Sequence, residues 1–223
     1  MKLKSFGCSF IFGSELSDNH DDLIVKNPIG RFSQLTWPAL VANYLNYTYE
    51  CHARPGSGNL QIAERILTEL SDPDPALYII NWTWIDRFDY YYRCDYWQPW
   101  ATIRPADATD VSLMYYKKLH SEYQDKLTSL MYMRLVIDTF KQKGFPFIIT
   151  YMDDLTFDQR WHTSPAIVDL QEYVKPYMTT FDNLNFLDWS KKNGYPITKI
   201  GHPLEQAHAA AAQYMLELGV HKV

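Results

Sequence analysis

The chain has 223 residues, 47% of them hydrophobic, and a formal net charge of −5. That length and apolar content are enough for one large core, so we expect residues 1–223 to form a single domain. The acidic balance provides no electrostatic footprint for a polyanion, which argues against nucleic acid as the principal partner.

The cysteines and the lengths of the apolar runs indicate in which compartment the protein acts and whether it holds a metal. Cys8, Cys51 and Cys94 are far apart and contain no CxxC pair, so they indicate neither a disulfide framework nor a zinc site. The amino terminus lacks the apolar core of a signal peptide, and no run approaches the roughly 20 apolar residues of a membrane span. We therefore expect a soluble, cytoplasmic protein without a cofactor. A virion-associated location is also compatible with these features.

The first informative stretch is LKSFGCSFIFGS, residues 3–14. Its apolar opening predicts a strand that ends at Gly7 and Cys8 and hands Ser9 to a tight turn. In an open α/β sheet, side chains at the carboxyl end of a strand face the ligand crevice. A serine in an ordinary glycine-flanked turn is the alternative. Residues 15–34 are rich in Asp, Asn and turn formers, and they predict a surface loop over the same edge.

A glycine-containing loop follows the second predicted strand. We expect a helix over 36–45, a strand over 47–52 and a helix over 60–70, with Gly56 and Gly58 in the connection before this second helix. Glycines let a backbone approach a ligand closely, and the amides that open a helix favour negative charge. The loop lacks both the lysine of a phosphate loop and the GxGxxG fingerprint, which disfavours a nucleotide site. A tight connection without a ligand is the other interpretation.

The third predicted strand, ALYIIN over 76–81, is a continuous apolar run typical of a buried strand. Asn81 and Thr83 come at its carboxyl end, where they could donate hydrogen bonds to an anionic oxygen beside Ser9. Capping of the strand end is the alternative role. Many aromatic residues lie between Trp82 and Trp100. Such a cluster suits either a core or a surface that binds sugar or a partner.

The second half of the chain continues the alternation. We expect helices over 109–140, within 164–180 with an end near Pro176, and from about 203 to 218, and strands over 145–151 and 186–187. Asp153, Asp154 and Asp158 follow the strand over 145–151. Their spacing matches no EF-hand, so solvated loop carboxylates are a better interpretation than a metal site. His202 lies just before the last helix, where Pro203 restricts the backbone.

Alternating strands and helices with short connections predict an α/β fold: a three-layer α/β/α arrangement with a mostly parallel, doubly wound sheet, of the flavodoxin-like type. Ser9, the Gly56 loop, the polar groups after the third strand and His202 would meet at one edge of this sheet. A nucleophile, oxyanion donors and a base together predict an acyl-transfer site.

In this order the motifs resemble those of the SGNH, or GDSL-like, hydrolase superfamily over the whole chain. Gly7-Cys8-Ser9 is similar to the Gly-Asp-Ser element, with cysteine in place of the aspartate, and Gly56 lies where the second-block glycine is expected. Asn81-Trp82-Thr83 occupies the third, Gly-x-Asn block, and Gly201-His202-Pro203 matches the end of the fourth, Asp-x-x-His-Pro block. The residues in and around these motifs resemble those of SGNH-like proteins found in bacteriophage genomes.

The resemblance implies that Ser9 attacks an ester carbonyl while His202 takes its proton. It also implies an oxyanion hole formed by the serine amide, Gly56 and the third block, where Asn81 stands at the glycine position and Thr83 at the asparagine position. The family places an orienting aspartate three residues before the histidine, where this chain has Lys199. The histidine would then need a carboxylate from elsewhere, and we take Asp188 as the candidate.

Two functions are compatible with this pattern. The first is a serine-dependent ester hydrolase, an esterase or deacetylase, acting on a small acyl ester or an acylated carbohydrate. The second is an SGNH-fold module without full catalytic power, which binds a glycan or a protein through the aromatic cluster at 82–100. Lys199 and Thr83, both departures from the family pattern, motivate the second.

Overall fold

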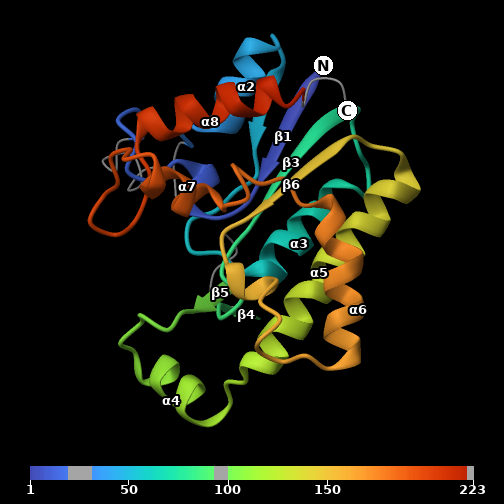
Figure 1. Cartoon of the computed structure of the whole chain (residues 1–223), viewed down its shortest axis with the longest axis vertical. Helices are drawn as coiled ribbons and strands as arrows, with labels where there is room; N and C mark the ends of the chain where they lie inside the picture. Colours follow the sequence, from blue (N-terminus) through green and yellow to red (C-terminus); the bar gives the residue numbers. More distant parts are fainter. Residues whose placement is uncertain (20–31, 93–99, 220–223) are drawn as a thin grey trace.

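The structure of the protein, a computed structural model, describes residues 1–19, 32–92 and 100–219. Its centre is a parallel sheet of β1 (Lys2–Phe6), β2 (Thr48–Cys51), β3 (Ala76–Trp82) and β6 (Phe147–Tyr151). The strand order is β2-β1-β3-β6 (Figure 1). The chain thus winds outward from β1 in both directions, as a doubly wound sheet does.

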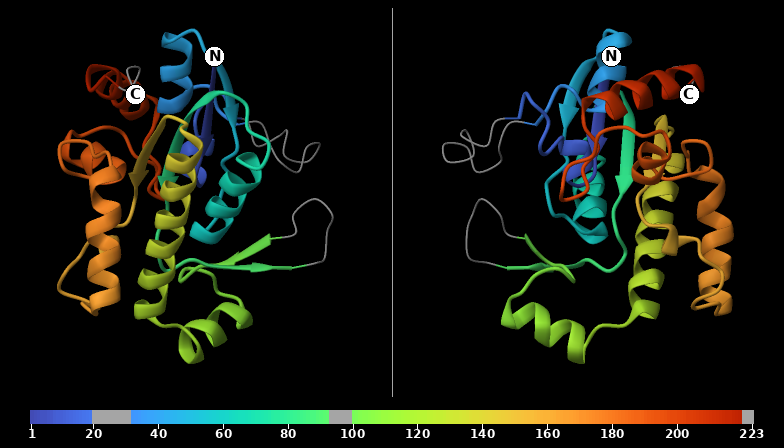
Figure 2. Two further views of the ribbon diagram at one scale, coloured as in Figure 1. Left: turned by 90° about the vertical axis from the view of Figure 1, so that its right-hand side faces the viewer. Right: turned by 60° about the vertical axis from the view of Figure 1, so that its left-hand side comes forward.

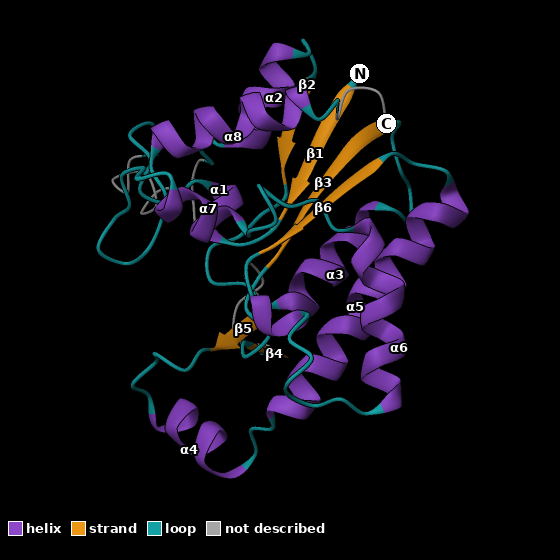
Figure 3. Ribbon diagram, viewed as in Figure 1, coloured by secondary structure: helices purple, strands orange, loops and turns teal. Residues whose placement is uncertain are grey.

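Helices cover both faces of this sheet (Figures 1 and 3). One face carries α2 (Trp37–Tyr44), α7 (Phe186–Lys192) and α8 (Glu205–Glu217), and the other carries α3 (Asn59–Glu69), α5 (Glu122–Lys143) and α6 (Pro165–Val174). Side chains alternate along β3 because successive strand residues point to opposite faces. Leu77 and Ile79 enter the first core, and Tyr78 and Ile80 enter the second. The three-layer α/β/α prediction is confirmed.

A smaller assembly lies beyond the carboxyl ends of the parallel strands. It consists of the antiparallel hairpin β4 (Phe88–Tyr91) and β5 (Trp100–Ile103) together with α4 (Asp110–Lys118) (Figure 2). The other short elements are α1 (Ser9–Phe12) and the 3₁₀ turns η2 (Asp154–Thr156) and η3 (Lys175–Tyr177). The sequence pattern did not predict the hairpin, since its aromatic residues show no clear alternation.

Three predicted elements differ from the structure. The helix expected over 109–140 is two helices, because Ser121 caps α5 by accepting a hydrogen bond from the Gln124 amide. The helix expected within 164–180, with its end near Pro176, stops at Val174, two residues earlier, and a 3₁₀ turn containing Pro176 follows. The strand expected over 186–187 is wrong, because these residues open α7 with Asn185 as its N-cap. A pair of apolar residues is too short to distinguish a strand from a helix.

Within the ranges that the structure describes, no helix is long and apolar enough to cross a membrane.

Candidate active site

Ser9 is presented by a sharp turn between β1 and the short helix α1. A Cβ atom on Gly7 would lie 2.8 Å from the Ile11 Cγ1 and 3.1 Å from the Asn81 carbonyl oxygen. Only glycine therefore lets this turn pass so close to the end of β3. Gly13 ends α1 in the left-handed region, with φ of 78°. Ser9 is the first helical residue, so its backbone N–H has no intrahelical acceptor.

The Ser9 hydroxyl contacts His202, as the sequence predicted. The distance from His202 Nε2 to Ser9 Oγ is 2.8 Å, although the two residues lie 193 positions apart. The backbone and the ring of His202 each have a partner. The His202 amide donates to Thr198 Oγ1, and the Phe10 ring meets the imidazole edge-on at 5.0 Å. The histidine is thus held in one direction before any substrate binds.

The second ring nitrogen of His202 faces Glu15, which the sequence reasoning missed. His202 Nδ1 lies 2.6 Å from Glu15 Oε2, and the Thr198 hydroxyl donates to the same oxygen at 2.7 Å. Glu15 follows α1 directly and has φ of 69°, a conformation that side-chain-bearing residues rarely adopt. A carboxylate therefore stands behind the histidine, but it comes from the loop after Ser9 and not from the segment before His202.

The structure corrects the expectation for Asp188. Its carboxylate accepts hydrogen bonds from Asn185 Nδ2 at 2.8 Å and from Lys191 Nζ at 3.0 Å, both within the first turns of α7. Asp188 therefore has a local role at a helix end, and its proposed role as the orienter of His202 is wrong. The error follows from the wrong strand prediction over 186–187, which placed this residue at a strand end.

The expected oxyanion donors of the third block lie in the interior. Asn81 is 1% exposed, and its side-chain amide already donates to Thr150 Oγ1 on β6 at 2.7 Å. One of its two amide N–H groups is thus bonded within the sheet, and the burial of the residue does not support Asn81 as a donor to substrate. Thr83 is fully buried. Its backbone amide donates to the Asn59 side chain, and its backbone carbonyl accepts from the same side chain. The Thr83 hydroxyl has no hydrogen-bond partner among the described residues.

The Gly56 loop is attached to the turn that presents Ser9. The Arg54 amide donates to the Gly7 carbonyl at 3.1 Å. Arg65 Nη2 donates to the same carbonyl at 3.3 Å and to Ser57 Oγ at 3.0 Å. Gly56 itself lines a cavity of about 310 Å³. The loop and the nucleophile turn are therefore parts of one hydrogen-bonded unit.

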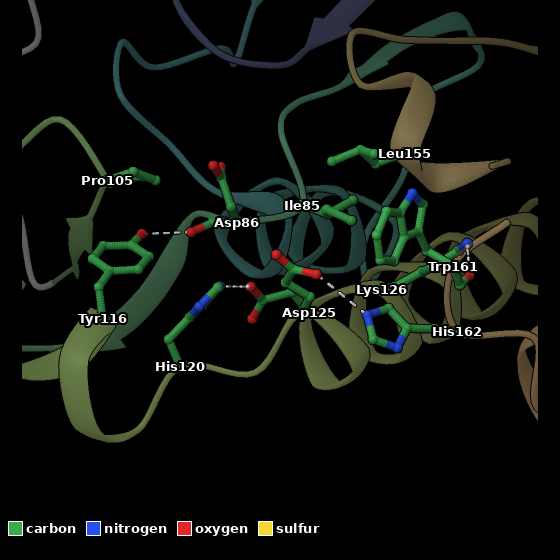
Figure 4. A pocket seen from close by; sticks show the side chains of 11 residues that line it. Ile85, Asp86, Pro105, Tyr116, His120, Asp125, Lys126, Leu155, Trp161 and His162 are labelled. Carbon is green, nitrogen blue, oxygen red and sulfur yellow. Dashed lines mark hydrogen bonds and ion pairs between the residues drawn. The ribbon is translucent and has the colours of Figure 1, made fainter.

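A second cavity, of about 480 Å³, lies beside the start of α5 and includes neither Ser9 nor His202 (Figure 4). It contains another histidine–carboxylate pair, His120 and Asp125, 2.7 Å apart. Burial raises the pKa of Asp125 to about 6, against the opposing effect of His120. Trp161 stands at this cavity with 58% of its surface exposed. No serine, threonine or cysteine is among the described residues that line the cavity, so none of these nucleophiles is placed beside the pair there.

The acidic residues after β6 have local partners. Asp153 is buried and accepts from the amides of Ile85 and Leu155, so it is not the solvated carboxylate that the sequence suggested. Asp154 accepts from Asn185, and Asp158 pairs with Arg160. In the part of the chain that the structure describes, no group of three or more acidic, histidine or cysteine side chains is arranged to hold a metal ion.

No protein-family model and no curated protein matches this sequence. Solved structures do match its fold. The esterase EstA from Pseudoalteromonas sp. is 8% identical with a TM-score of 0.54, over 97% of this chain and 94% of that one. TesA is 11% identical with a TM-score of 0.54, over 97% of both chains. A lipolytic protein of the G-D-S-L family from Veillonella parvula is 11% identical with a TM-score of 0.49, over 97% of both.

The chain has the SGNH hydrolase fold. At identities this low the likeness concerns the fold, so the chemistry has to be argued from the site itself. Within this SGNH fold, the aspartate that the family pattern places before the histidine is Lys199. Glu15 provides a carboxylate at the corresponding nitrogen of the imidazole.

Proposed function

We propose that this protein is a serine-dependent ester hydrolase, with Ser9 as the nucleophile, His202 as the general base and Glu15 as the residue that orients His202. The observation that carries the proposal is one continuous line of hydrogen bonds. It runs from Ser9 Oγ to His202 Nε2 over 2.8 Å and from His202 Nδ1 to Glu15 Oε2 over 2.6 Å. This is the nucleophile, base and orienter arrangement of a catalytic triad.

The proposed roles require one arrangement of the protons. Glu15 accepts the Nδ1 proton of His202, which leaves Nε2 as an acceptor for the Ser9 hydroxyl. As Ser9 Oγ attacks the ester carbonyl carbon, its proton passes to Nε2. The imidazolium then gives this proton to the oxygen of the leaving alcohol, and an acyl-enzyme remains. A water molecule releases the acid by the same sequence, again with His202 as base and then acid.

The negative oxygen of the tetrahedral intermediate needs donors next to Ser9. The free backbone N–H of Ser9 at the start of α1 supports a role as the first donor, because the amino end of a helix favours negative charge. The backbone of Gly56 remains our candidate for the second, in agreement with its loop being bonded to Gly7. Thr83 stays a weaker candidate, since its hydroxyl is buried.

The substrate class that we propose is a small acyl ester or an acylated carbohydrate.

The experiment that tests the proposed function measures hydrolysis of short-chain p-nitrophenyl esters by the wild type and by Ser9→Ala. We expect turnover by the wild type, loss of turnover in Ser9→Ala and unchanged circular dichroism. Ser14→Ala is the matched control, because Ser14 lies in the same segment and makes no contact with His202. Equal rates in the wild type and Ser9→Ala would refute the proposal.

The binding-module alternative loses much of its motivation. Glu15 compensates for the lysine at position 199, which was one reason to doubt activity. The aromatic cluster at 82–100 is partly core: Trp82 is fully buried, and Trp84 packs between Phe10 and Arg87. Residues 93–99 of this cluster lie outside the described ranges. Serine-dependent turnover would exclude a purely binding role.

A further inference from the structure

Four arginines gather around the Gly56 loop of this acidic protein. Arg65 and Arg87 donate to the Ser57 side chain and carbonyl, at 3.0 and 2.9 Å. Arg104 Nη1 lies 3.7 Å from the place where a Cβ of Gly56 would be, and Arg54 belongs to the loop itself. Among the described residues, only Arg104 of these four has a carboxylate within ion-pair distance. Three of the four guanidinium groups therefore have no direct carboxylate partner in the part of the chain that the structure describes.

The nearby carboxylates are occupied by structural contacts. Asp89 accepts from the amides of Gly58 and Gln61, from the Gln61 side chain and from the Thr102 hydroxyl. Asp107 holds the Nε and Nη2 edge of Arg104. The Asp89 contacts tie β4 and β5 to the start of α3. They fix the hairpin beside the loop and leave the guanidinium groups of Arg54 and Arg87 without an acidic partner in the described part of the chain.

Two of the four arginines, Arg54 and Arg104, border a cavity of about 310 Å³ between the loop and β5. Its lining includes Arg54, Arg104, Gly56, Trp100 and Thr102. No described residue accepts a hydrogen bond from the Arg54 side chain or from Arg104 Nη1. Two cationic groups with free donors thus face a space large enough for a small molecule, with an indole and a hydroxyl beside them.

Arg65 is the buried member of this group, and its pKa is lowered. Burial, and after it the positive charge of Arg54, lower the pKa of Arg65 to about 10, against the opposing effects of Asp89 and Glu64. The contribution of Arg54 to this shift places the two guanidinium groups close enough to repel each other, and an anion between them would reduce that repulsion.

We propose that this cavity binds an anionic group, a carboxylate or a phosphate, carried by the alcohol part of the ester substrate. The guanidinium fork matches both groups in shape and charge. The loop that lines the cavity is bonded to Gly7, two residues before Ser9, and contains Gly56, our candidate for the second oxyanion donor. This inference rests on the proposed function. Since the proposed acyl group is small, the charge belongs to the alcohol part, which in an acylated carbohydrate means an acidic sugar.

The kinetic test compares O-acetylated methyl glucuronoside with O-acetylated methyl glucoside, which differ in one carboxylate. We expect kcat/KM to be about tenfold or more higher for the glucuronoside, the size expected of a charged hydrogen bond to substrate. In Arg54→Gln and in Arg104→Gln, the ratio of the two kcat/KM values should fall toward one, mainly because the KM for the glucuronoside rises. Arg134→Gln is the matched control, since Arg134 lies on α5 against Tyr173. A ratio near one in the wild type, or one that neither variant changes, overturns the proposal.

A binding measurement separates this inference from the hydrolase proposal. Calorimetric titration with glucuronate and with glucose needs no turnover. Glucuronate should bind about tenfold more tightly than glucose, and Arg54→Gln should remove the difference. Equal binding of the two sugars overturns the anion site even in an active esterase. If inorganic phosphate binds but glucuronate shows no advantage, the cavity holds a free anion and the substrate assignment is wrong.

Discussion

Replacement of Glu15 by glutamine tests the orienting carboxylate without a change in side-chain size. The glutamine carbonyl can still accept the Nδ1 proton, but the negative charge that stabilises the imidazolium is lost. In a serine protease the equivalent aspartate-to-asparagine change lowers kcat by about 10⁴. The Glu15 side chain is 36% exposed, so solvent screens part of its charge. The Thr198 hydroxyl also donates to the same oxygen. We therefore expect a smaller loss, of about 10² to 10³ in kcat.

The assay is p-nitrophenyl ester hydrolysis under single-substrate steady-state conditions, with thermal unfolding as the check on structure. KM should change little, because Glu15 acts on the base and not on the bound ester. Asp188→Asn is the control, since the sequence favoured Asp188 but the structure places it with Asn185 and Lys191. The reasoning would be refuted by a Glu15→Gln variant within threefold of the wild type, or by an equal loss in Asp188→Asn.

Two further predictions concern stability. Gly13→Ala should destabilise the fold by more than Gly144→Ala, as measured by urea unfolding. Both glycines have positive φ, but a Cβ at Gly13 would lie 2.4 Å from Ser33 Cβ, whereas Gly144 has nothing within 4 Å. We expect about 1 kcal/mol at Gly144 and several at Gly13; equal losses would contradict the packing argument. For His208, burial lowers the pKa to about 3, against Glu205. The ring is therefore neutral in the fold and protonates first in the unfolded chain. Stability should fall below about pH 6.5, by up to about 1.4 kcal/mol per pH unit, until about pH 3. His208→Gln should flatten this slope in urea titrations between pH 6 and 4, and an unchanged slope would show that other groups dominate.

The fold and the two ends of the hydrogen-bonded line could be predicted because their signals are local. Apolar runs such as ALYIIN mark buried strands, and parallel strands bring their carboxyl ends to one edge. Ser9 follows the first strand and His202 precedes the last helix, so their meeting was expected and is confirmed at 2.8 Å.

Glu15 could not be predicted because its position depends on the path of an irregular loop. Its contact with His202 joins residues 187 positions apart. The loop offers several carboxylates, and the left-handed backbone at Glu15 that selects one of them has no periodic signal. The hydrogen-bond partner of the Asn81 amide could not be predicted for a related reason. Its partner, Thr150, is set by the register between β3 and β6, which the sequence does not reveal.

The central claim, that Ser9 is an activated nucleophile, is tested most directly by a fluorophosphonate probe and intact-mass measurement. We predict one adduct per chain, located on Ser9 by peptide mapping, absent from Ser9→Ala and formed more slowly by Glu15→Gln. A wild-type protein that stays unlabelled, or that carries its adduct on another residue, would contradict the claim.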